Sequence, residues 1–272
     1  MIVTLGIVFL LLEEAVGFFQ QVSIKEFLLG TNWAPMFEPR SFGVLPLVCG
    51  TFWVTFGAAL IGLPTGLGIG LFLNDFAPSW LRNLVKPVLE ILAGIPTVVY
   101  GYFALTVITP WLQNLLPSVE VFNAASAAIV VGLMVLPMVA SLCDDAIKAV
   151  PRSVKEAGYA LGATKSEVAT QVTIPSALSG IIASFILALS RAFGETMAVT
   201  LAAGSTPKIT LNPFESVQTL TAYIVQVSTG DTPQGSIEYK SIFAVGILLL
   251  AVSLLFNMLA FYLVKKYRTV GE

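Results

Sequence analysis

Five long apolar runs limit what this chain can fold into. They cover residues 44–73, 88–112, 122–142, 176–203 and 241–264. A helix that crosses a bilayer needs about 20 mainly apolar residues, and each run reaches that length. Only 11% of the 272 residues are charged, whereas a soluble domain typically has about 25%. The sequence therefore predicts an all-α integral membrane protein, with one transmembrane domain over residues 1–272.

A sixth apolar run, residues 1–12, opens the chain and ends at Glu13 and Glu14. It lacks the basic start and small-residue cleavage site of a signal peptide. We interpret it as a first transmembrane helix that is short, or truncated by the choice of start. About six transmembrane helices are therefore expected.

The composition excludes several kinds of site. The chain has no histidine, which removes Ser-His-Asp and Cys-His nucleophiles and the commonest metal ligand. Cys49 and Cys143 fall in or beside apolar runs, where small buried hydrophobes are expected. A net charge of −2 gives no sign of nucleic-acid binding. The glycine-rich stretch 62–70 lacks the Lys-Ser/Thr of a phosphate loop and is interpreted as helix packing. We expect no catalytic residue and no bound metal or cofactor.

Orientation follows from the loop charges, because cytoplasmic loops are rich in Lys and Arg. Placing segments 74–87, 143–175 and 265–272 in the cytoplasm puts nine such residues inside: Arg82, Lys86, Lys148, Arg152, Lys155, Lys165, Lys265, Lys266 and Arg268. Four then lie outside: Lys25, Arg40, Lys208 and Lys240. Both termini are therefore predicted to be cytoplasmic, with outer loops at 13–43 and 204–240.

The stretch "EAGYALGATKSEVATQVTIP", 156–175, is polar although apolar runs flank it. Pro151 suits a first helical position, and Val154, Ala157 and Leu161 share one helix face. Gly162 can take the left-handed conformation that ends a helix. The pattern predicts a compact helix–turn–helix over residues 151–175, which we call the knob. Its second helix begins with a capping box, Thr164 to Glu167, and Pro175 is expected to stop it and open the next spanning helix. From pattern alone, an ordinary amphipathic connector on the membrane surface fits as well.

This stretch resembles the EAA loop of ABC-importer permeases, whose pattern is E-A-A, three residues, G, nine residues, I-x-L-P. The matching positions are Glu156, Ala157, Gly158, Gly162, Val172, Ile174 and Pro175. Gly158, Val172 and Ile174 depart conservatively from the pattern. The resemblance implies a coupling helix that sits in a cleft on a separate ATPase subunit, and a MetI-like type I ABC importer permease fold.

Other segments resemble phosphate-importer permeases: 90–105, "EILAGIPTVVYGYFAL", and 189–205, "LSRAFGETMAVTLAAGS". Segments 42–51 and 149–165 are similar to the PstC-type subunit rather than its PstA-type partner. The resemblance covers about residues 27 to 265. It implies a homologous PstA-type permease, two PstB-type ATP-binding subunits and an external PstS-type phosphate-binding protein as partners. The chain would lie in the cell (plasma or inner) membrane among lipid, without nucleic acid, and ATP would be used by the partners.

An anion importer needs positive charge or N–H dipoles along a wet path, and only Arg191 lies well inside a spanning run. Such a charge is costly in the membrane and usually faces a partner or a cavity. Glu195 follows at i+4, and Glu90 lies near the start of another run. A self-neutralising Arg191–Glu195 pair is one alternative; an anion path with a glutamate at its gate is the other. The resemblance favours the path, because its Arg-x-x-x-Glu-Thr pattern matches Arg191, Glu195 and Thr196.

Two further patterns concern helix packing. Gly180, Ser184, Ala188 and Ala192 repeat every four residues, which suits either an interface with a second permease or packing within the chain. Pro96 is expected to kink its helix because it removes a hydrogen bond.

The sequence thus predicts one half of the translocation path of an ATP-driven phosphate importer. A permease for sulfate, molybdate or another oxyanion is the same-class alternative. A membrane scaffold or sensor that uses the knob for signalling without transport is the different-class alternative, and the cost of Arg191 in the membrane argues against it. Both outer loops are candidate docking sites for the binding protein, and a solvated connector fits any single residue in them equally well.

Overall fold

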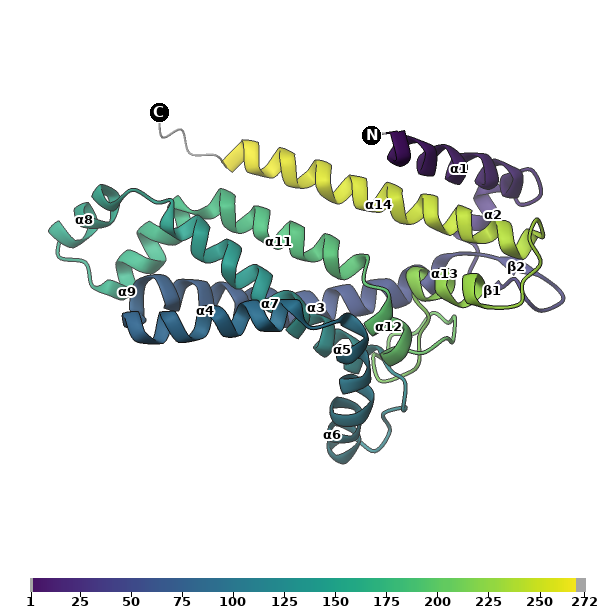
Figure 1. Cartoon of the computed structure of the whole chain (residues 1–272), viewed down its shortest axis with the longest axis horizontal. Helices are drawn as coiled ribbons and strands as arrows, with labels where there is room; N and C mark the ends of the chain where they lie inside the picture. Colours follow the sequence, from purple (N-terminus) through teal and green to yellow (C-terminus); the bar gives the residue numbers. More distant parts are fainter. Residues whose placement is uncertain (1, 268–272) are drawn as a thin grey trace. The chain divides into compact units, whose positions relative to one another are not determined.

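The computed structural model describes residues 2–267, and Arg268, on which the orientation prediction draws, lies outside them. The described residues group into two compact units. Unit 1 contains the residues up to 57 together with 97–131 and 193–254; unit 2 contains 58–96, 132–192 and the residues from 255 on. Four helices contribute residues to both units: α3 (Leu45–Leu71), α7 (Ala124–Lys148), α11 (Leu178–Phe193) and α14 (Ile237–Tyr267) (Figure 1).

Unit 1 adds shorter elements to its parts of these helices. They are α1 (Ile2–Phe19), α2 (Ile24–Leu29), β1 (Trp33–Ala34), β2 (Ser41–Phe42), α5 (Thr97–Phe103), α6 (Thr109–Leu115), α12 (Met197–Ala202) and α13 (Leu220–Thr229). The two strands pair antiparallel, with Trp33 opposite Phe42. This small ladder is absent from the all-α prediction. The hydrophobic core of unit 1 is rich in aromatic residues. In it, the Trp33 ring packs edge-on against Tyr223 with 4.8 Å between the ring centroids, a favourable geometry for aromatic pairs.

Unit 2 holds α4 (Ser79–Gly94), α8 (Arg152–Ala160), α9 (Lys165–Glu167) and α10 (Ile174–Ser176). Wider π-helical turns occur at Phe72–Phe76 after α3 and at Val168–Thr173 between α9 and α10. A third, Ala104–Ile108, joins α5 to α6 in unit 1. Such turns hold an extra residue and are frequent at functional sites.

Small residues let α3 approach α7 closely. A Cβ added at Gly62 would lie 2.7 Å from a methyl group of Val135, and one added at Gly66 would lie 2.6 Å from Val139. The helix-packing interpretation of 62–70 is therefore confirmed. The stripe on α11 also packs within the chain: Gly180 faces Ala146 at a distance that leaves no room for a Cβ, and the Ser184 hydroxyl lies 3.1 Å from the Cys143 sulfur.

Two predicted runs and one predicted loop have different boundaries in the structure. α1 continues through Glu13 and Glu14 to Phe19, because glutamate is a good helix former and Phe18 anchors the helix end in the aromatic core. The predicted loop 74–87 is mostly helix, since α4 begins at Ser79. α4 ends at Gly94, so the run 88–112 is broken rather than kinked: Ile95 is extended (ψ 129°) as the residue before Pro96 must be.

The run 176–203 is also broken. α11 ends at Phe193, and α12 begins only at Met197. The backbone between them is held by unit 1, because the Thr221 hydroxyl donates to the Glu195 carbonyl at 2.8 Å. A local sequence pattern does not show this contact, since it joins residues 26 positions apart.

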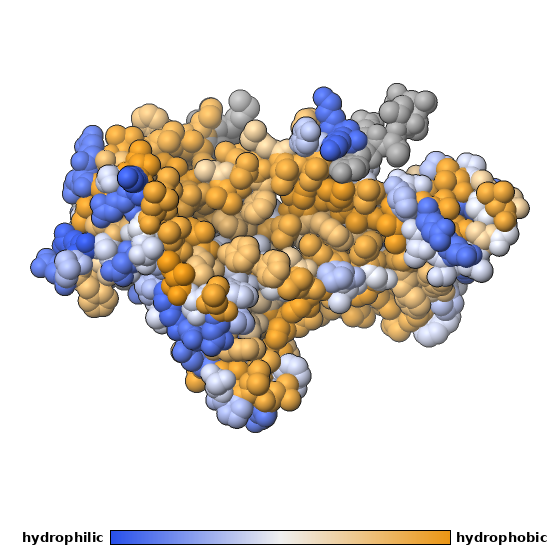
Figure 2. Space-filling view, turned by 180° about the vertical axis from the view of Figure 1, so that it is seen from behind, coloured by the Kyte–Doolittle hydropathy of each residue, from blue (hydrophilic) through white to orange (hydrophobic). Residues whose placement is uncertain are grey.

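By length and composition, three stretches of described helix could cross a membrane: Leu45–Phe76, Ala124–Lys148 and Ile237–Lys266. Two further pairs of helices, each bent at a short break, raise the number of candidate spans to as many as five if each pair counts as one span. Hydrophobic residues cover most of the face seen in Figure 2, with hydrophilic residues in separate patches. Many large apolar side chains are exposed, including Val3 and Phe9 on α1 and Met258 and Phe261 on α14, as a lipid environment allows.

The α3–α7 contact makes a first prediction. Gly66→Ala should destabilise the protein by about 1–3 kcal/mol, because its Cβ would overlap Val139. Gly68→Ala is the matched control on the same helix, since a Cβ there meets nothing within 4 Å, and it should leave stability unchanged or raised by up to about 1 kcal/mol. Thermal unfolding of the purified protein in detergent measures both. Equal effects of the two substitutions would contradict the close approach.

Candidate functional site

The knob has the predicted helix–turn–helix form (Figure 1). Gly162 has φ +84°, the left-handed conformation that lets the chain reverse after α8. The capping box is present: the Glu167 amide donates to the Thr164 hydroxyl at 3.3 Å, and the Thr164 amide donates to the Glu167 carboxylate at 2.7 Å. One boundary differs, because Pro151 is the extended residue before the helix rather than its first helical residue.

Gly158 sets how closely the two arms of the knob pack. A Cβ at this position would lie 3.1 Å from a methyl group of Val168 and 3.5 Å from one of Val172. Glycine in place of the pattern's third alanine therefore fits the close approach of α8 to the π-helical turn. Pro175 stands at the end of the second helix as predicted, because the described helix Lys165–Ser176 ends one residue after it. The chain then bends by 72° before α11.

The outer face of α8 is exposed within the described chain. Glu156 and Ala157 are exposed, as are the apolar side chains of Val154 and, at 90%, Leu161. The predicted shared face of Val154, Ala157 and Leu161 thus points away from the core.

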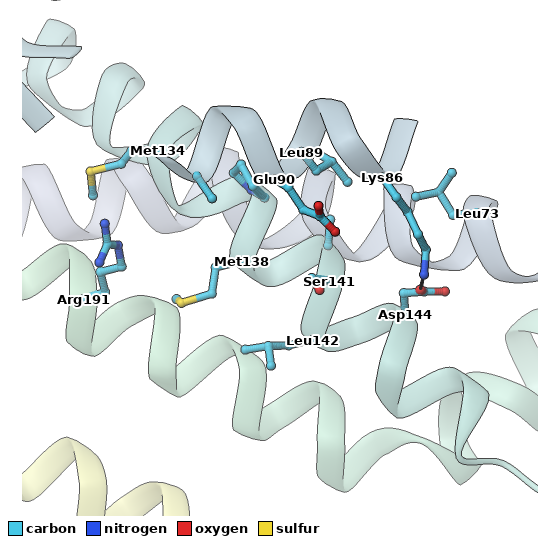
Figure 3. A pocket seen from close by; sticks show the side chains of 13 residues that line it. Leu73, Lys86, Leu89, Glu90, Met134, Met138, Ser141, Leu142, Asp144 and Arg191 are labelled. Atoms are coloured by element: carbon cyan, nitrogen blue, oxygen red, sulfur yellow. Dashed lines mark ion pairs between the residues drawn. The ribbon is translucent and has the colours of Figure 1, made fainter. Parts of the chain in front are cut away.

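A cavity of about 400 Å³ lies among α4, α7 and α11 in unit 2. Figure 3 shows Arg191 on α11 facing Met134 of α7, and Glu90 entering from α4. Two of the predicted path residues, Arg191 and Glu90, therefore line the same cavity from different helices. Within the described part of unit 2, Arg191 forms no ion pair.

The other two predicted path residues belong to unit 1. Glu195 is buried, and its carboxylate accepts a hydrogen bond from the Ala198 amide at 3.2 Å, which caps the first turn of α12. The Thr196 hydroxyl donates to the Gly194 carbonyl at 3.1 Å. The roles of Glu195 and Thr196 on the path, and the alternative pairing of Glu195 with Arg191, stay predictions.

The most concentrated charge cluster in the cavity wall centres on Asp144, which the sequence prediction does not include. Its side chain is 2% exposed and accepts from Lys86 Nζ at 2.7 Å and from Lys148 Nζ. Asn74 Nδ2 donates to the other carboxylate oxygen at 3.4 Å. A buried carboxylate is stable only when it is paired in this way. Figure 3 shows the Lys86–Asp144 pair at the end of the cavity lined by Leu73.

A sequence signal for Asp144 exists but is weak. Asp144 and Lys148 have the i,i+4 spacing of a helical ion pair, and they stand at the end of an apolar run. The contribution of Lys86 comes from another helix, and the spacing gives no sign of it. No group of three or more His, Cys, Asp or Glu side chains that could hold a metal ion occurs among residues 2–267.

Comparison with known proteins decides the family. Residues 62–269 match the model of the family "Binding-protein-dependent transport system inner membrane component". The chain belongs to this family. It is thus a membrane-embedded transport permease, and the matched region contains both the knob and the cavity.

Named relatives agree over most of the chain. It is 38% identical over 242 residues to the "Probable ABC transporter permease protein YqgH" of Bacillus subtilis, which covers 89% of this chain and 78% of that protein. It is 32% identical over 259 residues to the phosphate transport system permease protein PstC of Mesorhizobium japonicum, with 88% and 78% covered. The PstC protein of Haemophilus influenzae is also 32% identical, with 88% and 81% covered.

Solved structures support the fold. An inward-facing structure of the MetNI methionine ABC transporter contains a chain with TM-score 0.65 and 20% identity, covering 85% of this chain and 99% of that one. A bacterial alginate ABC transporter in complex with its periplasmic protein gives TM-score 0.66 and 17% identity, with 100% and 95% covered. The predicted MetI-like type I ABC importer permease fold is confirmed.

The charge cluster makes the second prediction. Asp144→Asn should destabilise the protein, because Lys86 and Lys148 lose their shared counter-ion. Breaking a buried ion pair costs about 3–5 kcal/mol; since the two lysine side chains are 37% and 39% exposed, solvent screening lowers the expected loss to about 1–3 kcal/mol.

Asp145→Asn is the matched control. Asp145 is the exposed neighbour of Asp144, and its substitution should change stability by less than about 0.5 kcal/mol. Thermal unfolding in detergent compares the two. If Asp144→Asn were as mild as the control, the cluster would not hold these helices.

Proposed function

We propose that this chain is the PstC-type permease subunit of an ATP-driven importer of inorganic phosphate, and forms half of the translocation path. The observation that carries the proposal is the similarity to proteins named as phosphate transport permeases at about 32% identity over most of the chain. The knob supports the importer class, because its glycine turn, capping box and exposed outer face fit a surface that another protein binds.

The proposed complex has three kinds of protein partner. A homologous PstA-type permease supplies the other half of the path, and two PstB-type subunits bind and hydrolyse ATP. A PstS-type protein delivers phosphate from outside and docks on the outer loops 13–43 and 204–240. The chain itself binds no cofactor in this proposal. The knob and both termini lie on the cytoplasmic side, which agrees with the excess of Lys and Arg in those segments.

In the proposed cycle, closure of the ATPases moves the knob through Glu156 and the exposed face of α8. That motion opens the path to the outside, where the binding protein releases the anion. Arg191 supplies positive charge in the membrane for an anion that carries one to two negative charges. Glu195 or Glu90 is the proposed gate partner, because a carboxylate can pair with the Arg191 guanidinium while no anion is present and release it when the path opens.

The third prediction tests the function by uptake. The chain and its co-encoded partners, reconstituted in proteoliposomes with ATP inside and the binding protein outside, should accumulate radiolabelled phosphate. Excess arsenate should compete and excess sulfate should not, because arsenate shares the charge and shape of phosphate. Competition by sulfate or molybdate instead would contradict phosphate as the substrate but would leave the assignment as an oxyanion permease in place. An assembled complex with active ATPase and no uptake would favour the scaffold or sensor.

The fourth prediction concerns coupling. Glu156→Lys should lower uptake about tenfold or more, the range of a coupling energy of a few kcal/mol, because it reverses the charge on the face offered to the ATPase. Ser166→Lys, also exposed on the knob, is the control and should retain most of the uptake. The two are compared at equal amounts of assembled complex. Normal uptake by Glu156→Lys would contradict the proposal that Glu156 couples this chain to the ATPase.

A further inference from the structure

Asn74, in the π-helical turn that follows α3, contacts both the knob and the charge cluster. Its amide Nδ2 donates to Asp144 Oδ1 at 3.4 Å, and its Oδ1 accepts from Lys155 Nζ at 3.2 Å. Lys155 lies on α8, directly before Glu156. A single neutral side chain therefore joins the helix proposed to bind the ATPase to the carboxylate at the end of the cavity.

The neighbouring contacts make the turn a firm junction. Lys155 also pairs with Asp75 Oδ1 at 2.9 Å, and both side chains are mostly buried, at 18% and 13% exposed. Arg82, near the start of α4, donates to the carbonyls of Leu73 and Asn74, each at 2.8 Å. These carbonyls stand at the end of a helix, where they have no further helical partner. The turn is thus fixed to α4 and α8 together.

The junction continues to the cavity wall. Asp144 forms an ion pair with Lys86 on α4. Leu73, Lys86 and Asp144 line the same cavity as Glu90 and Arg191. All of these residues belong to unit 2. Hydrogen bonds and ion pairs therefore connect α8 to the cavity wall, in addition to the backbone link from α7.

We propose that the Asn74 junction carries the movement of the knob to the α4–α7 wall of the cavity, and that Asn74 and Asp144 are positioning residues for coupling. The inference rests on the proposed function of the knob, and it adds a specific route within this chain. Energetic coupling between distant sites needs a contiguous set of contacts or a shared two-state element. The junction supplies the contacts from α8 to α4.

The test uses Asn74→Leu in the complete complex, because leucine keeps the number and branching of the side-chain heavy atoms and removes both hydrogen bonds without altering any charge. The matched control is Asn83→Leu, an exposed asparagine on α4. Phosphate taken up per ATP hydrolysed is measured for wild type and both variants. Asn74→Leu should lower this ratio about 5- to 10-fold, the scale of mutations along a coupling route, while ATP hydrolysis changes by less than about twofold and Asn83→Leu matches wild type.

A second readout does not depend on the substrate. Ala93 lines the cavity on α4 and is exposed, so Ala93→Cys can report its opening by the rate of maleimide labelling in a background with Cys49 and Cys143 replaced by alanine. Labelling is compared between the ATP-free and the vanadate-trapped complex. The two states should differ in the otherwise unaltered protein and in Asn83→Leu, and the difference should disappear in Asn74→Leu.

The outcomes separate the two proposals. If wild type takes up no phosphate but its labelling rate responds to trapping, the substrate assignment fails and the labelling readout still decides the role of Asn74. If Asn74→Leu keeps the wild-type ratio and the wild-type labelling response, the junction does not carry the movement. If it lowers uptake and ATP hydrolysis equally through poor assembly, the role is structural and the inference is overturned.

Discussion

The close contact of α3 with α7 is the interaction on which the arrangement of unit 2 depends. Within lipid, apolar side chains gain little from meeting one another, so helices associate where small residues allow their backbones to approach. Gly70 shows what this achieves at the end of α3, since a Cβ there would lie 2.9 Å from the Ala140 carbonyl oxygen and 3.0 Å from the Asp144 amide. Any larger residue would separate the turn that follows from the Asp144 carboxylate.

Different interactions stabilise the two units. Unit 1 relies on aromatic rings packed edge-on, with Phe18 at its centre and centroid distances of 5.3 Å to both Phe19 and Phe42. Unit 2 relies on glycine contacts and on one buried carboxylate shared by two lysines. Both the knob and the cavity lie in unit 2, so the surface proposed to receive the ATPase and the residues proposed for the path are parts of one compact body.

Local chemistry explains which features the sequence predicts well. The left-handed Gly162 and the Thr164–Glu167 capping box need only residues within a few positions of one another, and both are present as expected. The break at Pro96 also follows from a local steric rule. The break before α12 and the Asp144 cluster depend on residues far away in the chain, namely Thr221 and Lys86, and periodicity carries no information about such partners.

The π-helical turns have a consequence for how this chain can change over evolutionary time. Each holds one residue more than an α-helical turn, so loss of a single residue from Val168–Thr173 would restore ordinary helix rather than break it. A π-helical turn advances by a smaller angle per residue than an α-helical one, so the side chains just beyond it would keep nearly their present direction. The segment can therefore tolerate the loss of one residue here, whereas the same loss within an ordinary α-helical turn would rotate every later side chain by about 100°.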